Sequence, residues 1–77
     1  MMEQKHSEKY IALGLNIALY RKKKGLTQEA LAEKIGISRT HMSNIEATKV
    51  EKSMSLEVLF EIADTLGVDV GKLFEIR

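Results

Sequence analysis

Residues 27–46 read TQEALAEKIGISRTHMSNIE, and the spacing of residue types within them is more informative than any single residue. Its apolar residues recur at helical spacing on both sides of Gly36, which predicts two short helices separated by a sharp turn. Thr27 and Ser38 are good N-cap residues for the two helices, and Gly36 supplies the positive φ on which the first helix can end. So short a connection forces the helices to cross at a large angle, and Ala32 is small enough for that close contact. The stretch therefore predicts a helix-turn-helix.

Helical spacing of apolar residues also marks the segments before and after this unit. Ser7 can cap a first helix that ends at Gly25, directly after a basic run that suits a helix C-terminus. A fourth helix, capped by Ser55, ends at Gly67, and Asp69 can cap a short last helix. No stretch alternates as a strand does, so the fold class is predicted to be all-α with five helices. The apolar face of the first helix is expected to hold Tyr10, Ile11, Leu13, Ile17 and Tyr20, and that of the fourth Leu56, Leu59, Phe60, Ile62, Ala63 and Leu66.

The size and charge of the chain limit the number of its domains and the kinds of partner that it can bind. Its 77 residues are enough for one small domain, expected over residues 7–77 after a flexible N-terminal arm over residues 1–6. Residues 1–26 carry six Lys/Arg and two Asp/Glu (net +4), residues 27–54 carry four of each sign, and residues 55–77 carry two basic and five acidic residues (net −3). This asymmetry suggests that the basic end faces a polyanion, although a solvated surface without function is the competing interpretation.

Cysteine and long apolar segments are both missing from the sequence. The absence of cysteine fits a reducing compartment, and the longest mainly apolar stretch is too short and too interrupted to span a membrane or to act as a signal peptide. We therefore expect a cytoplasmic, nucleoid-associated protein without membrane partners.

Three blocks carry a resemblance to a known family. They read RKKKGLTQEALA (21–32), GISRTHMSNIE (36–46) and SLEVLFEIADTLGV (55–68). With these blocks in this order, the sequence resembles the Cro/C1-type (XRE family) helix-turn-helix regulators of phages and bacteria, over about residues 17–74. The resemblance implies a compact five-helix, lambda-repressor-like DNA-binding domain whose third helix enters the major groove of duplex DNA.

The resemblance also implies roles for individual residues. Arg39, Thr40 and Asn44 occupy the positions that meet base edges, where Arg suits guanine, Asn suits adenine and Thr can touch a thymine methyl group. Arg21 and Glu46 are implied to form a structural ion pair between the first and third helices. Contacts to DNA phosphates are implied for Gln28, Ser38, His41, Ser43, Lys49 and Lys52.

Two of these assignments have a structural alternative, and two depend on an unusual loop. Gln28 and Ser38 could simply cap or solvate their helices. The family commonly places an Asn-Gly pair after the glutamate that ends the third helix, where this chain has Ala47-Thr48. Without that glycine, the positions of Lys49 and Lys52 stay open.

An enzyme is not expected from this sequence. There is no cysteine, the two histidines are far apart, and no Gly-rich phosphate loop follows a strand, so no catalytic residue, metal site or cofactor is predicted. The function expected instead is sequence-specific binding of duplex DNA by a transcriptional regulator, most simply a repressor. One module makes few base contacts, so a homodimer on a pseudo-palindromic operator is expected. The candidate dimer interface comprises Val70, Leu73, Phe74 and Ile76, with closure of the monomer core as the alternative for Leu73 and Phe74.

A protein-interaction role is the alternative function. The same fold could serve as an antitoxin or as an adaptor, with a toxin or a polymerase as its protein partner and DNA binding secondary. The polar residues expected on the outer side of the third helix favour DNA, because a protein-docking helix more often carries an aromatic or aliphatic anchor there.

Overall fold

The computed structural model describes residues 6–47 and 54–76, and they contain helices and no strand. The predicted all-α class is therefore confirmed, but the fifth α-helix is not found, because the last element is a 3-10 helix. Asp69, the expected cap of that element, makes no side-chain cap hydrogen bond. Five residues are too few to offset the cost of nucleating an α-helix, whereas a short 3-10 turn suits such a segment. The elements are α1 (Ser7–Lys23), α2 (Gln28–Ile35), α3 (Arg39–Ala47), α4 (Leu56–Leu66) and the 3-10 helix η1 (Val70–Phe74).

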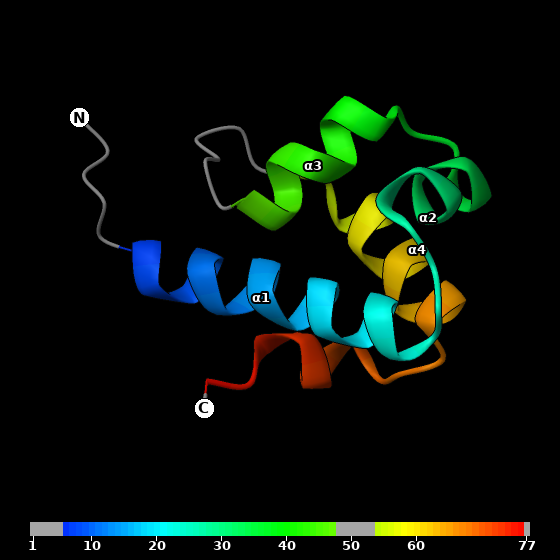
Figure 1. Cartoon of the computed structure of the whole chain (residues 1–77). Helices are drawn as coiled ribbons and strands as arrows, with labels where there is room; N and C mark the ends of the chain where they lie inside the picture. Colours follow the sequence, from blue (N-terminus) through cyan, green and yellow to red (C-terminus); the bar gives the residue numbers. More distant parts are fainter. Residues whose placement is uncertain (1–5, 48–53, 77) are drawn as a thin grey trace.

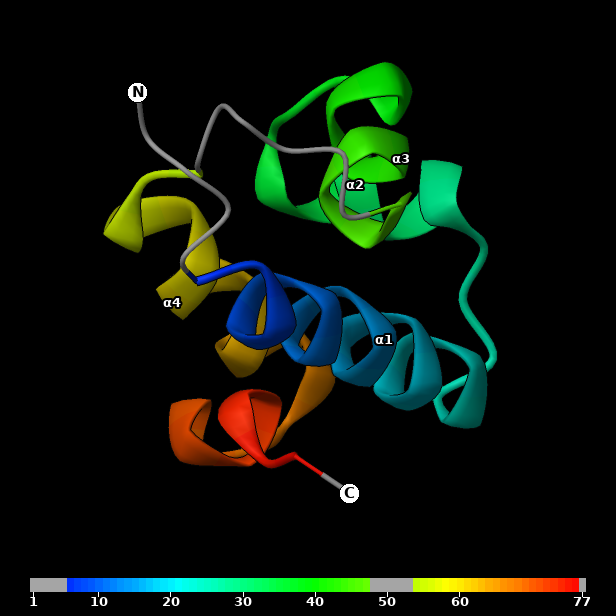
Figure 2. The same cartoon turned by 90° about the vertical axis from the view of Figure 1, so that its left-hand side faces the viewer.

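The helix α1 is the central element of the fold. The helix α3 packs along one side of α1, and η1 with the C-terminal segment packs along the opposite side (Figures 1 and 2). The helix α2 packs against both α3 and α4, and α4 also packs against η1. This arrangement leaves one long side of α3 open to solvent. No helix among the described residues is both long and apolar enough to cross a lipid bilayer.

A single core joins all five elements. Each element contributes one large side chain that is 0% exposed: Ile17, Leu31, Met42, Ile62 and Leu73. Burial of such a side chain contributes about 1.5–3 kcal/mol relative to leaving it in water. No element can therefore be displaced without exposing part of the shared core.

The expected apolar faces of α1 and α4 are broader than the core that they cover. Tyr10 and Ile11 of α1, and Leu56 and Phe60 of α4, are exposed. Helical spacing marks which residues are apolar along one side, but neighbouring helices cover only part of that side. These four apolar residues therefore lie on the surface of the monomer.

The starts of α2, α3 and α4 follow the sequence signals, whereas the start of α1 does not. Thr27, Ser38 and Ser55 each accept a hydrogen bond of 2.9–3.1 Å from the backbone N–H three residues on, as predicted for N-caps. Ser7 was expected to cap the first helix, but it is the first residue of α1, and His6 before it makes no side-chain cap hydrogen bond. The arm expected over residues 1–6 lies, apart from His6, outside the described residues.

Candidate nucleic-acid interface

The turn between α2 and α3 has the geometry of a helix-turn-helix. Gly36 has φ +82°, which a residue with a side chain rarely adopts, and its N–H donates to Glu33 O at 3.3 Å. The next N–H, from Ile37, donates to Ala32 O at 3.0 Å, so two backbone bonds close the end of α2. Ala32 is 2% exposed, as expected for a small residue at a close helix contact. The chain then enters α3 at Arg39.

The two sides of α3 differ sharply in chemistry. Met42 and Ile45, three residues apart, are buried in the core at 0% and 5% exposure. Arg39, Thr40 and Asn44 are exposed on the side that faces solvent, and we call them the polar row of α3. Arg39 carries a guanidinium with several N–H donors, and Asn44 carries an amide that both donates and accepts hydrogen bonds. Thr40 carries a hydroxyl and a methyl group. The row can therefore approach the edges of flat polar molecules such as base pairs.

A buried ion pair fixes α3 against α1. Arg21 Nε donates to Glu46 Oε2 at 2.7 Å, and Arg21 Nη2 donates to Glu46 Oε1 at 3.0 Å. The two side chains are only 9% and 6% exposed. Arg21 Nη1 also donates to Leu26 O at 2.7 Å, in the turn between α1 and α2. The structure thus contains the ion pair that the resemblance implies, and the same guanidinium holds the turn before α2.

Gln28 belongs to this network as well as to the start of α2. Its Nε2 donates to Glu46 Oε1 at 2.9 Å, and its side chain is partly buried. An amide nitrogen carries two hydrogens, so one contact to Glu46 leaves a second N–H for another acceptor. Ser38 is similar, because its Oγ accepts the His41 N–H at 2.9 Å while its own hydroxyl hydrogen can still be donated. Each residue therefore makes one hydrogen bond within the protein and can still donate another.

The other predicted phosphate-binding residues fall into two groups. His41 is exposed and Ser43 is partly buried, both on α3. Lys49 and Lys52 lie outside the described residues, as does Thr48 of the unusual loop.

The four candidate dimer residues differ in how far they are exposed. Leu73 is 0% exposed, so assigning it to an interface is wrong, because this side chain completes the monomer core. Val70 is partly buried and packs against the core. Phe74 and Ile76 are exposed, but Phe74 lines a hollow beside the N-terminus of α4, whereas Ile76 lines another against α1.

Asn16 is a structural residue that the sequence interpretation missed. Its Nδ2 donates to Leu73 O at 3.0 Å and to Glu75 O at 2.7 Å, and the residue is 4% exposed. These bonds hold η1 and the C-terminal segment against α1. The available signal was a lone amide in an apolar helix, since a buried polar group must find hydrogen-bond partners.

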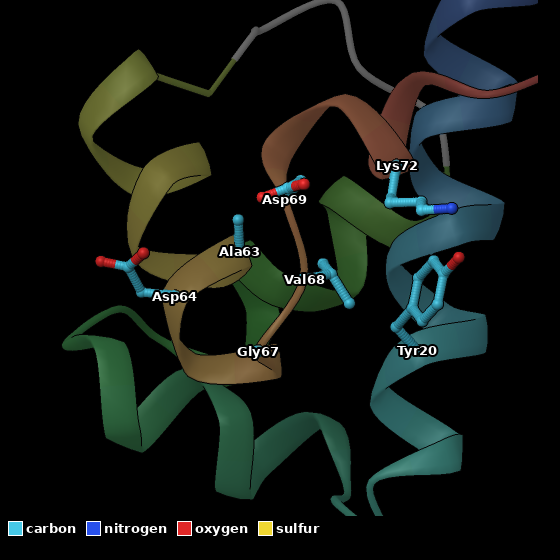
Figure 3. A pocket seen from close by; sticks show the side chains of 7 residues that line it. All are labelled: Tyr20, Ala63, Asp64, Gly67, Val68, Asp69 and Lys72. Atoms are coloured by element: carbon cyan, nitrogen blue, oxygen red, sulfur yellow. The ribbon is translucent and has the colours of Figure 1, made fainter.

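A separate hollow lies where α4 passes into η1 (Figure 3). Lys72 of η1 and Tyr20 of α1 lie side by side along one wall of it, and Asp64 points away from them. Lys23 Nζ also lies 5.5 Å from the centroid of the Tyr20 ring. None of the lining residues belongs to α2 or α3, so this hollow is distinct from the polar row. Within the described residues, no cluster of His, Asp and Glu is arranged to hold a metal ion.

An all-α domain with a tight turn between two crossing helices, one of them polar on its outer side, is a helix-turn-helix domain. Residues 17–73 match the family described as helix-turn-helix, and the chain belongs to this family. The resemblance to Cro/C1-type (XRE family) regulators is thereby confirmed.

Two curated proteins and two solved structures are similar to this chain in sequence or in fold. The chain is 33% identical to the HTH-type transcriptional regulator SinR of Bacillus subtilis over 82% of its own length and 56% of that protein. It is 35% identical to the immunity repressor protein of Bacillus phage phi105, over 82% of its length and 42% of that protein. The chain thus spans about half the length of these relatives. The restriction-modification controller protein C.AhdI of Aeromonas hydrophila superposes with a TM-score of 0.80 at 28% identity, covering 90% of this chain and 97% of that one. A structure of SinR in complex with DNA superposes with a TM-score of 0.73 at 33% identity, covering 82% of this chain and 98% of that one.

Proposed function

We propose that this chain is a sequence-specific regulator of transcription that binds duplex DNA through α3. The observation that carries this proposal is the polar row of Arg39, Thr40 and Asn44, exposed on a helix whose opposite side is buried. An α-helix fits the major groove of B-form DNA, where each base pair presents its own pattern of donors and acceptors. The proposed role is binding without catalysis.

Each residue of the polar row has a base that suits its chemistry. Arg39 can donate two hydrogen bonds to O6 and N7 of guanine, and Asn44 can bond N6 and N7 of adenine. The methyl group of Thr40 can contact the methyl group of thymine. Because the Arg21–Glu46 pair holds α3 rigidly against α1, these side chains start from a fixed backbone and little ordering is needed on binding.

Phosphate contacts are proposed for residues around the polar row. Gln28 and Ser38 lie at the N-terminal ends of α2 and α3, where free backbone N–H groups favour an anion. Both side chains can donate one more hydrogen bond, as described above. The same role is proposed for His41, Ser43, Lys49 and Lys52, with the two lysines contributing charge outside the described part of the chain.

We further propose that the protein acts as a repressor and as a two-fold dimer on a pseudo-palindromic operator. The name of the phage immunity repressor supports repression, and the structure of SinR in complex with DNA supports DNA as the ligand. One polar row touches few base pairs, whereas two copies double the contacts with half-sites about one helical turn (roughly 34 Å) apart. Such a protein works where the genome is, in the cytoplasm and in association with the nucleoid.

The second candidate function is a protein-interaction role, as an antitoxin or adaptor. A structure of a SinR–SinI protein complex matches this chain with a TM-score of 0.74 at 33% identity. This match supports a protein partner as the alternative ligand. The large exposed apolar residues of the described structure lie on α1, α4, η1 and the segment after it, not on α3. The chemistry of α3 therefore favours DNA for that helix.

Selection of bound sites from a random duplex pool tests the proposal most directly. A regulator of this kind should enrich one short motif with two-fold symmetry, and its affinity should fall with salt in proportion to the phosphates contacted. A protein-interaction module should enrich nothing. Absence of duplex binding even at low salt contradicts the proposal.

A further inference from the structure

A second apolar side of α1 faces away from the core. Ile11 and Leu15 are 45% and 61% exposed, and Leu19, four residues further on, is partly buried. The three residues follow the spacing i, i+4, i+8, so they run along one side of the helix, and we call them the outer stripe of α1. All three line one hollow with Ile76, which is 63% exposed. A helix that is apolar on two opposite sides is normally covered on both.

The charges at the two ends of the outer stripe have opposite signs. Glu8 lies seven residues before Leu15, and Lys22 lies seven residues after it. Seven residues make about two helical turns, so both charges lie on the same side of α1 as the stripe. Both side chains are exposed. Along this side the helix therefore presents an acid, three apolar residues and a base, arranged symmetrically about Leu15.

We propose that a second copy of this chain covers this side, with the two α1 helices antiparallel and the two-fold axis passing at Leu15. Leu15 then contacts Leu15 of the second copy, and Ile11 contacts its Leu19. Glu8 of each copy faces Lys22 of the other, which gives two charge pairs at the rim of the contact. A parallel pairing would place like charges together at both ends, so the charges select the antiparallel arrangement.

This geometry is compatible with the proposed dimer on DNA. An isologous contact uses the same patch on both copies, and a two-fold rotation keeps each group at the same height along its axis. That axis is perpendicular to both α1 helices, so both α3 helices lie on the same side of the pair. The inference rests on the proposed dimer but not on DNA binding.

Sedimentation of the full chain over a concentration series tests the interface. Leu15→Glu forces two carboxylates together at the axis and should raise the dimer Kd by roughly 100-fold or more. Leu56→Glu is the matched control, because Leu56 is 67% exposed on α4 and borders the other apolar hollow. It should leave the dimer Kd unchanged. Thermal unfolding by circular dichroism verifies that both variants stay folded.

A charge exchange tests the antiparallel register. Glu8→Lys alone or Lys22→Glu alone should each raise the dimer Kd about three- to tenfold, because each variant creates two repulsive pairs. The double variant Glu8→Lys/Lys22→Glu reverses both charges and should restore the wild-type Kd. Failure to restore it contradicts the antiparallel register.

A single-cysteine experiment gives an independent readout, since the chain contains no cysteine. Leu15→Cys should cross-link to itself with a short bis-maleimide, and Leu56→Cys should not. A monomeric wild type, or a dimer that Leu56→Glu disrupts and Leu15→Glu does not, overturns the proposal. Duplex binding measured on the same samples reports separately on the proposed function: a dimer that binds no duplex contradicts only DNA binding.

Discussion

Arg21 and Glu46, 25 residues apart in sequence, form a two-pronged ion pair with N–O distances of 2.7 and 3.0 Å. The pair joins the C-terminal part of α1 to the C-terminal part of α3, and both side chains are almost completely buried. Leu26 O and the Gln28 amide complete its hydrogen bonds. The orientation of the helix that carries the polar row is therefore set from α1.

Removing one partner of this ion pair should strongly lower the free energy of unfolding. Arg21→Met leaves the Glu46 carboxylate buried without its cation, which should lower the free energy of unfolding by about 3–5 kcal/mol. Urea denaturation followed by circular dichroism measures the loss. Lys72→Met is the control, because the Lys72–Glu75 pair is exposed and 3.7 Å long and should contribute less than about 0.5 kcal/mol. Equal losses in the two variants would show that the Arg21–Glu46 contact does not stabilise the fold.

Asn16 should stabilise the docking of the C-terminal segment more than it stabilises α1, the helix that contains it. Asn16→Asp keeps the shape of the side chain but turns the donor that faces Leu73 O and Glu75 O into an acceptor. Unpaired buried carbonyls and a carboxylate should together lower the free energy of unfolding by about 1–3 kcal/mol. Amide hydrogen exchange should also accelerate first in η1. Unchanged exchange there would contradict the anchoring role.

Gly36 is required for its backbone conformation and not for space. A Cβ at Gly36 would meet no atom within 4 Å, and the same holds at Gly71, but only Gly36 of these two has a positive φ. Gly36→Ala should therefore lower the free energy of unfolding by about 1–2 kcal/mol. Gly71→Ala should be neutral or stabilising by up to about 1 kcal/mol. Thermal melts of the two variants compare them, and a Gly36→Ala variant as stable as Gly71→Ala would disprove strain at the turn.

The parts of the fold that could be predicted from the sequence are those that local chemistry determines. Thr27 and Ser38 cap their helices because a hydroxyl at that position meets a free N–H three residues on. Gly36 ends α2 because the chain needs a positive φ there. These signals depend only on neighbouring residues, so one sequence suffices to recognise them.

The parts that could not be predicted depend on which elements meet in space. Leu73 and Phe74 are adjacent and both apolar, yet only Leu73 is buried in the core. Adjacent residues of a helix point in directions about 100–120° apart, and the packing of η1 against α1 and α4 determines which direction faces the core. Ile11 shares the apolar character of Leu13, but no described element covers it. Asn16 found its partners at Leu73 and Glu75, more than fifty residues away in sequence. Helical period alone contains no information on such partners.

Arg39 and Asn44 should determine which bases the protein recognises. Arg39→Ala and Asn44→Ala should each weaken binding to the selected site by about 1–3 kcal/mol and relax the base preference at one position. Lys72→Ala is the charge-matched control for Arg39→Ala, because it removes one positive charge from η1, outside α2 and α3. Fluorescence anisotropy with specific and scrambled duplexes distinguishes the loss of a base contact from the loss of a positive charge.

The specific and scrambled duplexes should respond differently in these variants. Arg39→Ala should reduce the ratio of specific to scrambled affinity, since a lost base contact affects only the correct sequence. Lys72→Ala should leave that ratio unchanged, because a charge far from α3 contributes only to the general attraction of a polyanion. If Arg39→Ala and Asn44→Ala both left the ratio unchanged, α3 would not be the helix that contacts the bases. Duplex binding would then have to be assigned to another surface of the chain.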